Sequence, residues 1–159
     1  MTSNPAKISK NSRYKQGVFV PKNPEKYFGK TGEAISYRSG WELRAMKWFD
    51  ENQSVVAWNS EGAVVPYYSE LDSKMHRYFV DFIAKMKLKD GTEKTYAIEV
   101  KPEAQCKPPT TKNKKRLLIE TIEYVKNQAK WKAAKAFFEE KGVQFIVITE
   151  FDLGISSRK

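Results

Sequence analysis

The sequence predicts a small α/β domain in which helices flank a mixed central β-sheet. Apolar residues recur with helical spacing in two segments, and elsewhere they alternate or run together as in β-strands. The resulting order of helix, strands, helix and strand is typical of such a domain. With 159 residues the chain has the length of one domain. We expect a flexible basic arm over residues 1–17 and a single folded domain over residues 18–159.

The composition is that of a folded protein with excess positive charge. Hydrophobic residues make up 40% of the chain and aromatic residues 13%, which argues against disorder throughout. The 29 Lys and Arg residues against 19 Asp and Glu give a net charge of +10, which favours binding to a polyanion such as nucleic acid over a merely basic, soluble surface. No apolar run approaches the roughly 20 residues of a membrane span, and we expect no secretory signal. The single Cys106 excludes an internal disulfide and a cysteine-based zinc site.

The first part of the predicted domain contains a short strand and then a helix. Residues 17–37 contain several Pro and Gly breakers and are expected to be extended or looped, with a strand near Val18–Val20. Residues 39–52, SGWELRAMKWFDEN, have apolar side chains at helical steps. Ser39 is a good N-cap, and Glu42, three residues later, fits a capping box.

The middle of the chain has the pattern of β-structure. Two short strands are expected at Val55–Trp58 and Ala63–Tyr68, with Pro66 indicating an edge position or a strand end. A polar connector over residues 69–77 precedes a strand from residue 78 to residue 88, in which apolar residues alternate. Asp90-Gly91 signals a turn, and the return strand follows over residues 96–100.

The last part of the chain is predicted to contain a loop, a long helix and a final strand. The loop covers residues 103–116 and contains a basic cluster. An amphipathic helix follows over residues 118–137, with a possible interruption near Asn127-Gln128 and a C-cap at Gly142. Residues 143–149, VQFIVIT, are apolar enough for a central, buried strand.

The hairpin around Asp90-Gly91 brings charged residues together. A three-residue loop at 89–91 places Asp81 directly opposite Glu99, whereas a two-residue turn places it opposite residue 100. Two opposed carboxylates repel each other, and a divalent cation between them removes that penalty. Mg²⁺ suits such a site, because it takes one or two protein carboxylates and keeps several waters.

Two further residues fit a hydrolytic metal site. Lys101 points the same way as Glu99 and can orient the attacking water or stabilise charge developing on a phosphate. Glu42 shares a helical stripe with apolar residues and is expected to face inward, where a carboxylate needs a partner. Its alternative role is the capping box with Ser39, and the alternative for the other charges is a solvated or paired strand face.

The acidic pair and lysine resemble the motif of the PD-(D/E)XK nuclease superfamily, in VDF and, after a gap, IEVK. Further stretches resemble the head-completion nuclease family of T-even-like bacteriophages, from about Gly17 to about Glu150. They are GVFVPKNPEKYFGK, IxYRSGWELRAMKWFDEN, HRYFVDF, IEVKP and QAKWKAAKAFFEEKGVQFIVITE. EVKPEAQCKPP also resembles the end-cutting endonucleases of some transposons. The chain departs from the superfamily pattern at Val80, which stands where proline precedes the first acid.

The resemblance implies a restriction-endonuclease-like core and a Mg²⁺-dependent DNA endonuclease, with Mn²⁺ as a substitute. It implies metal ligation by Asp81 and Glu99 with help from Glu42, and the backbone carbonyl of Val100 is a further candidate ligand. It also implies head completion after DNA packaging, in the cytoplasm of an infected bacterium, with capsid, portal or neck proteins as partners and retention in the virion as one outcome. The alternatives are a transposon-end or junction endonuclease and a non-enzymatic DNA-binding head or neck protein.

Several basic residues are candidate DNA contacts. They are Arg38, Lys112, Lys114, Lys115 and Arg116. The alternative for the cluster is a solvated charge run. His76, Gln128 and Lys130 are weaker candidates for the site. No base-reading motif is visible, so we expect recognition of the DNA backbone, ends or branches with little sequence specificity.

Overall fold

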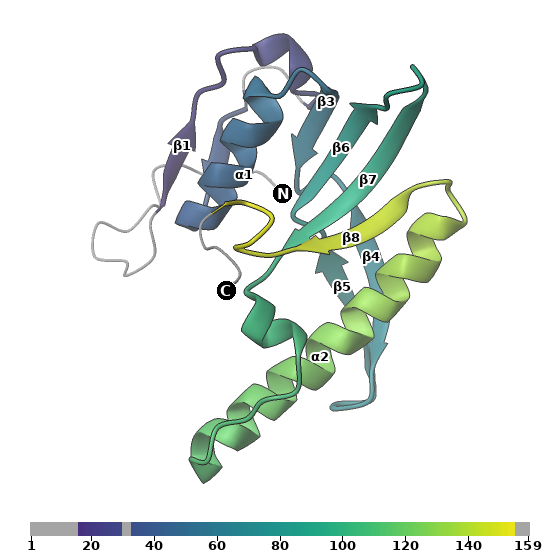
Figure 1. The fold of residues 1–159 in the computed structure, drawn as a ribbon. Helices are drawn as coiled ribbons and strands as arrows, with labels where there is room; N and C mark the ends of the chain where they lie inside the picture. Colours follow the sequence, from purple (N-terminus) through teal and green to yellow (C-terminus); the bar gives the residue numbers. More distant parts are fainter. Residues whose placement is uncertain (1–15, 30–32, 155–159) are drawn as a thin grey trace.

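The computed structural model describes residues 16–29 and 33–154, drawn in colour in Figure 1. Residues 1–15 of the predicted arm lie outside the described residues. The strands are β1 (Gly17–Phe19), β2 (Ile35–Tyr37), β3 (Val55–Ser60), β4 (Val64–Ser69), β5 (Lys74–Phe79), β6 (Phe82–Lys87), β7 (Glu93–Val100) and β8 (Gln144–Ile148). The helices are α1 (Gly40–Glu51) and α2 (Lys114–Glu139), with short 3-10 helices η2 (Pro24–Lys26) and η3 (Glu103–Cys106).

A four-stranded mixed sheet forms the centre of the fold, as the sequence predicts. Its strand order is β3-β6-β7-β8, with β7 antiparallel to β6 and parallel to β8. β1 pairs with β2 and β4 pairs with β5 in separate two-stranded sheets. The edge position suggested by Pro66 is confirmed, because β4 pairs only with β5 in the described chain.

Two apolar clusters hold the helices against opposite faces of the central sheet (Figure 1). The α1-side cluster includes Phe49, Trp58 and Phe82, and the rings of Phe49 and Phe82 lie 5.1 Å apart. The α2-side cluster includes Val65 and Phe138 and joins α2 to the β4–β5 pair. Burial of these large side chains is the main stabilising term of the fold.

The predicted central position of the last strand is wrong. β8 is at an edge of the sheet and pairs only with β7 among the described residues. Its apolar run has a different cause, because both faces of this edge strand are covered. Phe145 packs in the α2-side cluster, whereas Ile146 and Ile148 pack against the α1-side cluster.

The strand predicted over residues 78–88 is divided by a bend at Val80-Asp81. Before the bend, Tyr78 pairs with Val65 of β4, and after it Phe82 pairs with Ser60 of β3. The predicted connector over 69–77 is correspondingly too long, because β5 begins at Lys74. The alternation of apolar residues in the sequence continues through the bend and therefore does not reveal it. In the structure the two sides of the bend face different clusters, with Tyr78 in the α2-side cluster and Phe82 in the α1-side cluster.

The turn between β6 and β7 is the three-residue alternative. Lys87 pairs with Glu93, and the Leu88 N–H donates to the Thr92 carbonyl at 2.7 Å. Gly91 has φ +87°, a conformation that suits glycine because it lacks a Cβ. The register continues to Phe82 opposite Ile98, so residue 81 comes to lie opposite residue 99.

The long helix differs from its prediction at its start and in its middle. α2 begins at Lys114, with Asn113 accepting the Arg116 N–H at 3.0 Å, so part of the predicted basic loop is helical. The helix continues through Asn127 without interruption, and Gly142 follows its end with φ +71°. Although α2 has 26 residues, no helix in the described chain is long and apolar enough to cross a membrane.

Candidate active site

Asp81 and Glu99 meet where the β5–β6 bend passes the end of β7. Glu99 points to the α2 side of the sheet, because Ala97, two residues earlier on β7, packs in the α2-side cluster. Asp81 lies in the bend, and its Oδ2 accepts the backbone N–H of Val100 at 2.8 Å. Glu99 is 7% exposed and Asp81 is half-buried, so both acids are partly shielded from solvent.

The two oxygens of Glu99 have different partners. Oε2 accepts a hydrogen bond from the hydroxyl of Tyr78, which comes from β5. Oε1 lies 3.6 Å from Nζ of Lys101, the residue two positions farther along the chain. The structure therefore brings Asp81, Glu99 and Lys101 together as the sequence predicts. It also adds Tyr78, which the sequence predicts only as one of the alternating apolar residues of a strand.

The acidic pair holds protons more tightly than free carboxylic acids do. Burial raises the pKa of Asp81 well above its ordinary value, and the negative charge of Glu99 raises it further. Burial also raises the pKa of Glu99, although the Tyr78 hydroxyl and Lys101 oppose the shift. Burial and the charge of Glu99 raise the pKa of Tyr78, so its hydroxyl stays protonated and remains a donor.

This electrostatic imbalance fits a bound cation. Two buried carboxylates that face each other gain stability from a shared proton or a shared positive charge. Their oxygens are hard ligands of the kind that Mg²⁺ and Mn²⁺ take in proteins. The side chains of Asp81 and Glu99 therefore suit a divalent ion, and the expected contribution of the Val100 carbonyl stays a prediction.

Glu42 lies at the border of this site and also serves the helix. Its N–H donates to Ser39 Oγ at 3.1 Å, and its Oε2 accepts the Arg38 N–H at 3.0 Å. Burial raises the pKa of Glu42, and the negative charges of Glu61 and Glu99 contribute. Across residues 16–29 and 33–154, no three His, Cys, Asp or Glu side chains form a metal-binding group. Glu42 is thus electrostatically linked to the acidic pair without completing a three-carboxylate cluster.

The weaker candidates separate into two kinds. Lys130 of α2 lies at the site, with Nζ 5.6 Å from the centre of the Tyr78 ring. Burial lowers the pKa of Lys130 and the positive charge of Lys101 adds to that effect, whereas the negative charge of Glu99 opposes it. His76 instead contacts Asp72 at 2.7 Å and stacks on Tyr67, which is a structural arrangement within the β4–β5 pair. Gln128 is exposed.

The candidate DNA contacts lie at two places. Arg38 precedes α1 and pairs with Glu61 at 3.6 Å, next to Glu42. Lys112, Lys114, Lys115 and Arg116 are exposed around the start of α2, at the end of that helix which projects beyond the sheet (Figure 1). Arg116 pairs with Glu120 at 3.0 Å. Only Arg38 is therefore beside the carboxylates, and the basic cluster is placed to contact a more distant part of a polyanion.

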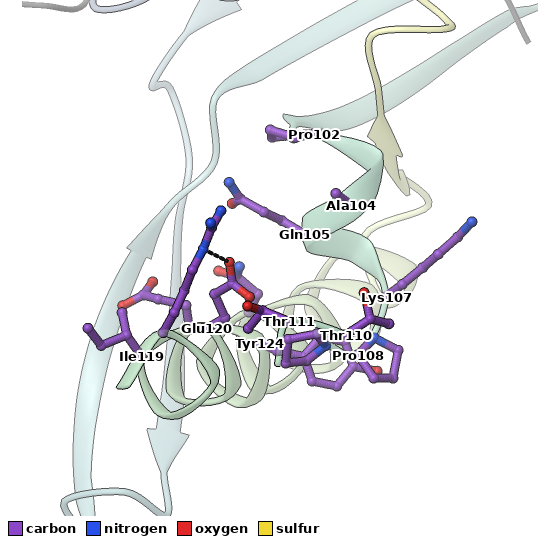
Figure 2. A pocket seen from close by; sticks show the side chains of 14 residues that line it. Pro102, Ala104, Gln105, Lys107, Pro108, Thr110, Thr111, Ile119, Glu120 and Tyr124 are labelled. Atoms are coloured by element: carbon purple, nitrogen blue, oxygen red, sulfur yellow. Dashed lines mark hydrogen bonds and ion pairs between the residues drawn. The ribbon is translucent and has the colours of Figure 1, made fainter. Parts of the chain in front are cut away.

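A cavity lies between η3 and the first half of α2. It has a volume of about 740 Å³ and begins at Pro102, the residue after Lys101. Figure 2 shows Gln105 on one side of this cavity and Thr110 and Thr111 of the following loop on the other, close to α2. Its lining includes Glu120 and Glu123 but none of Asp81, Glu99 and Lys101, so the cavity is separate from the acidic pair.

Two comparisons with known proteins identify the family of this chain. Residues 52–150 match a family described as TnsA-like endonuclease N terminal, and this region contains the acidic pair and Lys101. The head completion nuclease of Enterobacteria phage T4 is 39% identical over 140 residues, which cover 84% of this chain and 90% of that protein. The resemblance to phage head-completion nucleases predicted from sequence motifs is confirmed.

Proposed function

Because the chain belongs to the TnsA-like endonuclease family, we propose that it is a divalent-metal-dependent endodeoxyribonuclease acting in phage head completion. One observation supports the chemistry above all others: the buried Glu99 and the half-buried Asp81 meet, with Lys101 Nζ 3.6 Å from a Glu99 oxygen. The biological setting comes from the name of the T4 relative. The proposed ion is Mg²⁺, with Mn²⁺ as a substitute.

The residues that would hold the ion are Asp81 and Glu99, with the Val100 carbonyl as a further ligand and Glu42 at the border. When bound, the ion supplies Lewis acidity at a phosphoryl oxygen and neutralises charge. Tyr78 keeps Glu99 Oε2 in a fixed orientation through its hydrogen bond. Because the Tyr78 hydroxyl already holds Glu99, this carboxylate needs little rearrangement before the reaction.

Lys101 acts on the reacting groups. Its ammonium orients the attacking water and stabilises the negative charge that develops on the phosphate. The water oxygen forms a bond to phosphorus while one phosphorus–oxygen ester bond breaks, which leaves a phosphate monoester and a hydroxyl group. Hydrolysis of this kind cleaves the DNA backbone without reading a base.

Recognition of DNA rests on charge. The net charge of +10 and the exposed basic residues favour phosphate contacts over base contacts. We assign Arg38 to phosphates near the site and the cluster of Lys112, Lys114, Lys115 and Arg116 to phosphates farther along the duplex. Such contacts give affinity with little sequence specificity.

The cellular setting follows from the same proposal. A nuclease that finishes packaged heads works in the cytoplasm of the infected bacterium, where capsid, portal or neck proteins position it, and it is retained in the virion if those contacts persist. The family match also keeps a transposon-end or junction endonuclease as a second candidate. Cleavage of linear, nicked, end-bearing and four-way DNA in parallel separates the two, since a head-completion enzyme needs no transposon end or junction.

Plasmid nicking tests the proposed enzyme. Supercoiled DNA is incubated with and without Mg²⁺ and with wild type, Asp81→Ala or Lys101→Ala. We expect nicking only by wild type and only with the ion. The active-site assignment is overturned if all three proteins nick alike. If none nicks while all bind DNA, the non-enzymatic DNA-binding alternative is supported instead.

A further inference from the structure

Helix α2 brings a second lysine to the acidic pair from outside the strand motif. Nζ of Lys130 lies 5.6 Å from the ring centre of Tyr78, whose hydroxyl donates to Glu99. Glu99 is in turn 3.6 Å from Lys101. Lys130 and Lys101 therefore flank the same carboxylate from two different elements.

The ammonium of Lys130 is near the charge of Glu99 but does not form an ion pair or a hydrogen bond within the described residues. In contrast, Lys101 is paired with Glu99 and Lys126 with Glu123 at 4.0 Å. Lys130 is partly buried and close enough to Lys101 for the two charges to repel. Burial and the charge of Lys101 disfavour this ammonium, and the charge of Glu99 offsets only part of that cost, so a further anion at Nζ is favourable. The ring of Tyr78 compensates only part of this cost.

We propose that Lys130 is a second catalytic lysine, whose ammonium binds a non-bridging oxygen of the scissile phosphate. This inference rests on the proposed nuclease function. The proposal gives the two lysines different roles according to the groups that they contact. Lys101 is held by Glu99 and acts on the attacking water, whereas the unpaired Lys130 is free to bind the substrate anion.

The position of Lys130 on α2 also suggests the path that a bound DNA strand follows away from the site. Lys126 is four residues before Lys130, on the same face of α2 and one helical turn of about 5.4 Å away. These two lysines form a short positive row that leads from the acidic pair toward the basic start of the helix. A strand bound at Lys130 can therefore place its next phosphates along α2.

Matched lysine variants on α2 test the proposal. Lys130→Met removes the charge and keeps the aliphatic length, and Lys130→Arg keeps the charge. Lys132→Met is the control, because Lys132 is exposed on the same helix and loses the same charge. Cleavage of a short duplex gives kcat and KM, and fluorescence anisotropy with Ca²⁺ in place of Mg²⁺ gives DNA affinity as a function of salt.

We expect Lys130→Met to lower kcat/KM about a hundredfold, the typical effect of removing one donor to a reacting oxyanion. It should also reduce the salt slope of DNA binding by about one phosphate contact. Lys130→Arg should keep most of the activity, and Lys132→Met should change neither quantity more than about twofold. The melting temperature of Lys130→Met should be equal to or above that of wild type, because an unfavourable charge is removed.

Two results overturn the proposal. One is Lys130→Met behaving like Lys132→Met in both cleavage and binding. The other is a loss of activity that merely follows a lower melting temperature, which indicates a structural role on the Tyr78 ring. If wild type cleaves, either result rejects the Lys130 role alone. If wild type does not cleave with any divalent ion, the nuclease proposal fails, and equal salt slopes for the two variants then reject the phosphate contact separately.

Discussion

Two regions of this protein bury acidic side chains, and they do so in opposite ways. At the end of α1, Asp50 is 2% exposed, and its two oxygens accept the backbone N–H groups of Asn23 at 3.0 Å and Lys22 at 2.9 Å. At the end of β7, Asp81 has one backbone N–H donor, and Glu99 has one tyrosine hydroxyl and a lysine.

The difference separates a structural carboxylate from a candidate catalytic one. Both oxygens of Asp50 are used to tie the segment before η2 to α1, so little is left for a ligand. Asp81 and Glu99 instead face each other, and burial raises the pKa of each. Such an arrangement lowers stability locally and favours an incoming cation.

The largest expected effect is on catalysis at the acidic pair. Lys101→Met should reduce kcat/KM about a thousandfold, because it removes charge stabilisation at the reacting phosphate. Lys85→Met is the control, since Lys85 lies on β6 and pairs with Glu93 near the surface. Initial rates on a labelled duplex measure both variants. Equal rates for the two variants would contradict the catalytic role of the site at Asp81 and Glu99.

Asp50→Asn should produce the largest loss of stability. The amide replaces one acceptor oxygen with a donor that faces a backbone N–H, which should lower the free energy of unfolding by about 2 kcal/mol. Chemical denaturation measures the loss, and cleavage per folded molecule should stay at the wild-type rate. Reduced activity in fully folded Asp50→Asn would show that the two acidic regions are not independent.

Asp81→Asn should have the opposite effect on stability, and the effect should grow with pH. An acid whose pKa is raised on folding binds more protons in the folded state than in the unfolded state. The contribution of Asp81 to the free energy of unfolding is therefore greatest below its ordinary pKa of 3.8 and falls as pH rises through the raised value. Without metal, the variant should therefore melt a few degrees above wild type at about pH 8, since about 1 kcal/mol shifts the melting temperature by about 2–4 °C at this size. Near pH 3.8 the difference should be smallest. A difference that shrinks with rising pH contradicts the assignment of strain to this carboxylate.

The smallest effect is expected at Glu42, where the two roles overlap. Glu42→Gln keeps an acceptor for the Arg38 N–H, so its stability should change little while its activity falls about tenfold. Ser39→Ala should do the reverse, with about 1 kcal/mol lost from the helix cap and no change in activity per folded molecule. Full activity in Glu42→Gln assigns this residue to the cap alone.

Much of this site was predictable because it depends on local rules. Strand alternation and the Asp90-Gly91 turn place Asp81 near Glu99, and both loop lengths that the sequence allows lead to that result. The structure selects the three-residue loop. The cap at Ser39 is also a short-range signal and is confirmed, whereas the C-cap of α2 is Glu140 and the predicted Gly142 lies two residues beyond it with φ +71°.

The parts that sequence missed depend on which layers a segment joins. At the Val80-Asp81 bend the chain stops pairing with β4 and starts pairing with β3. The apolar residues still alternate through the bend, so the sequence pattern does not reveal it. β8 is apolar on both faces because helices cover both, which imitates a central strand. The approach of Lys130 to Tyr78 joins α2 to β5, and no local spacing encodes it.

Direct Mn²⁺ binding tests the contrast between the two acidic regions most simply. Titration of the ion into protein, followed by the electron paramagnetic resonance signal of free Mn²⁺, measures binding without any need for cleavage. We predict that wild type and Asp50→Asn remove free Mn²⁺ with equal affinity and that Asp81→Asn does not. Equal binding by Asp81→Asn and wild type would contradict the assignment of the acidic pair as the metal site.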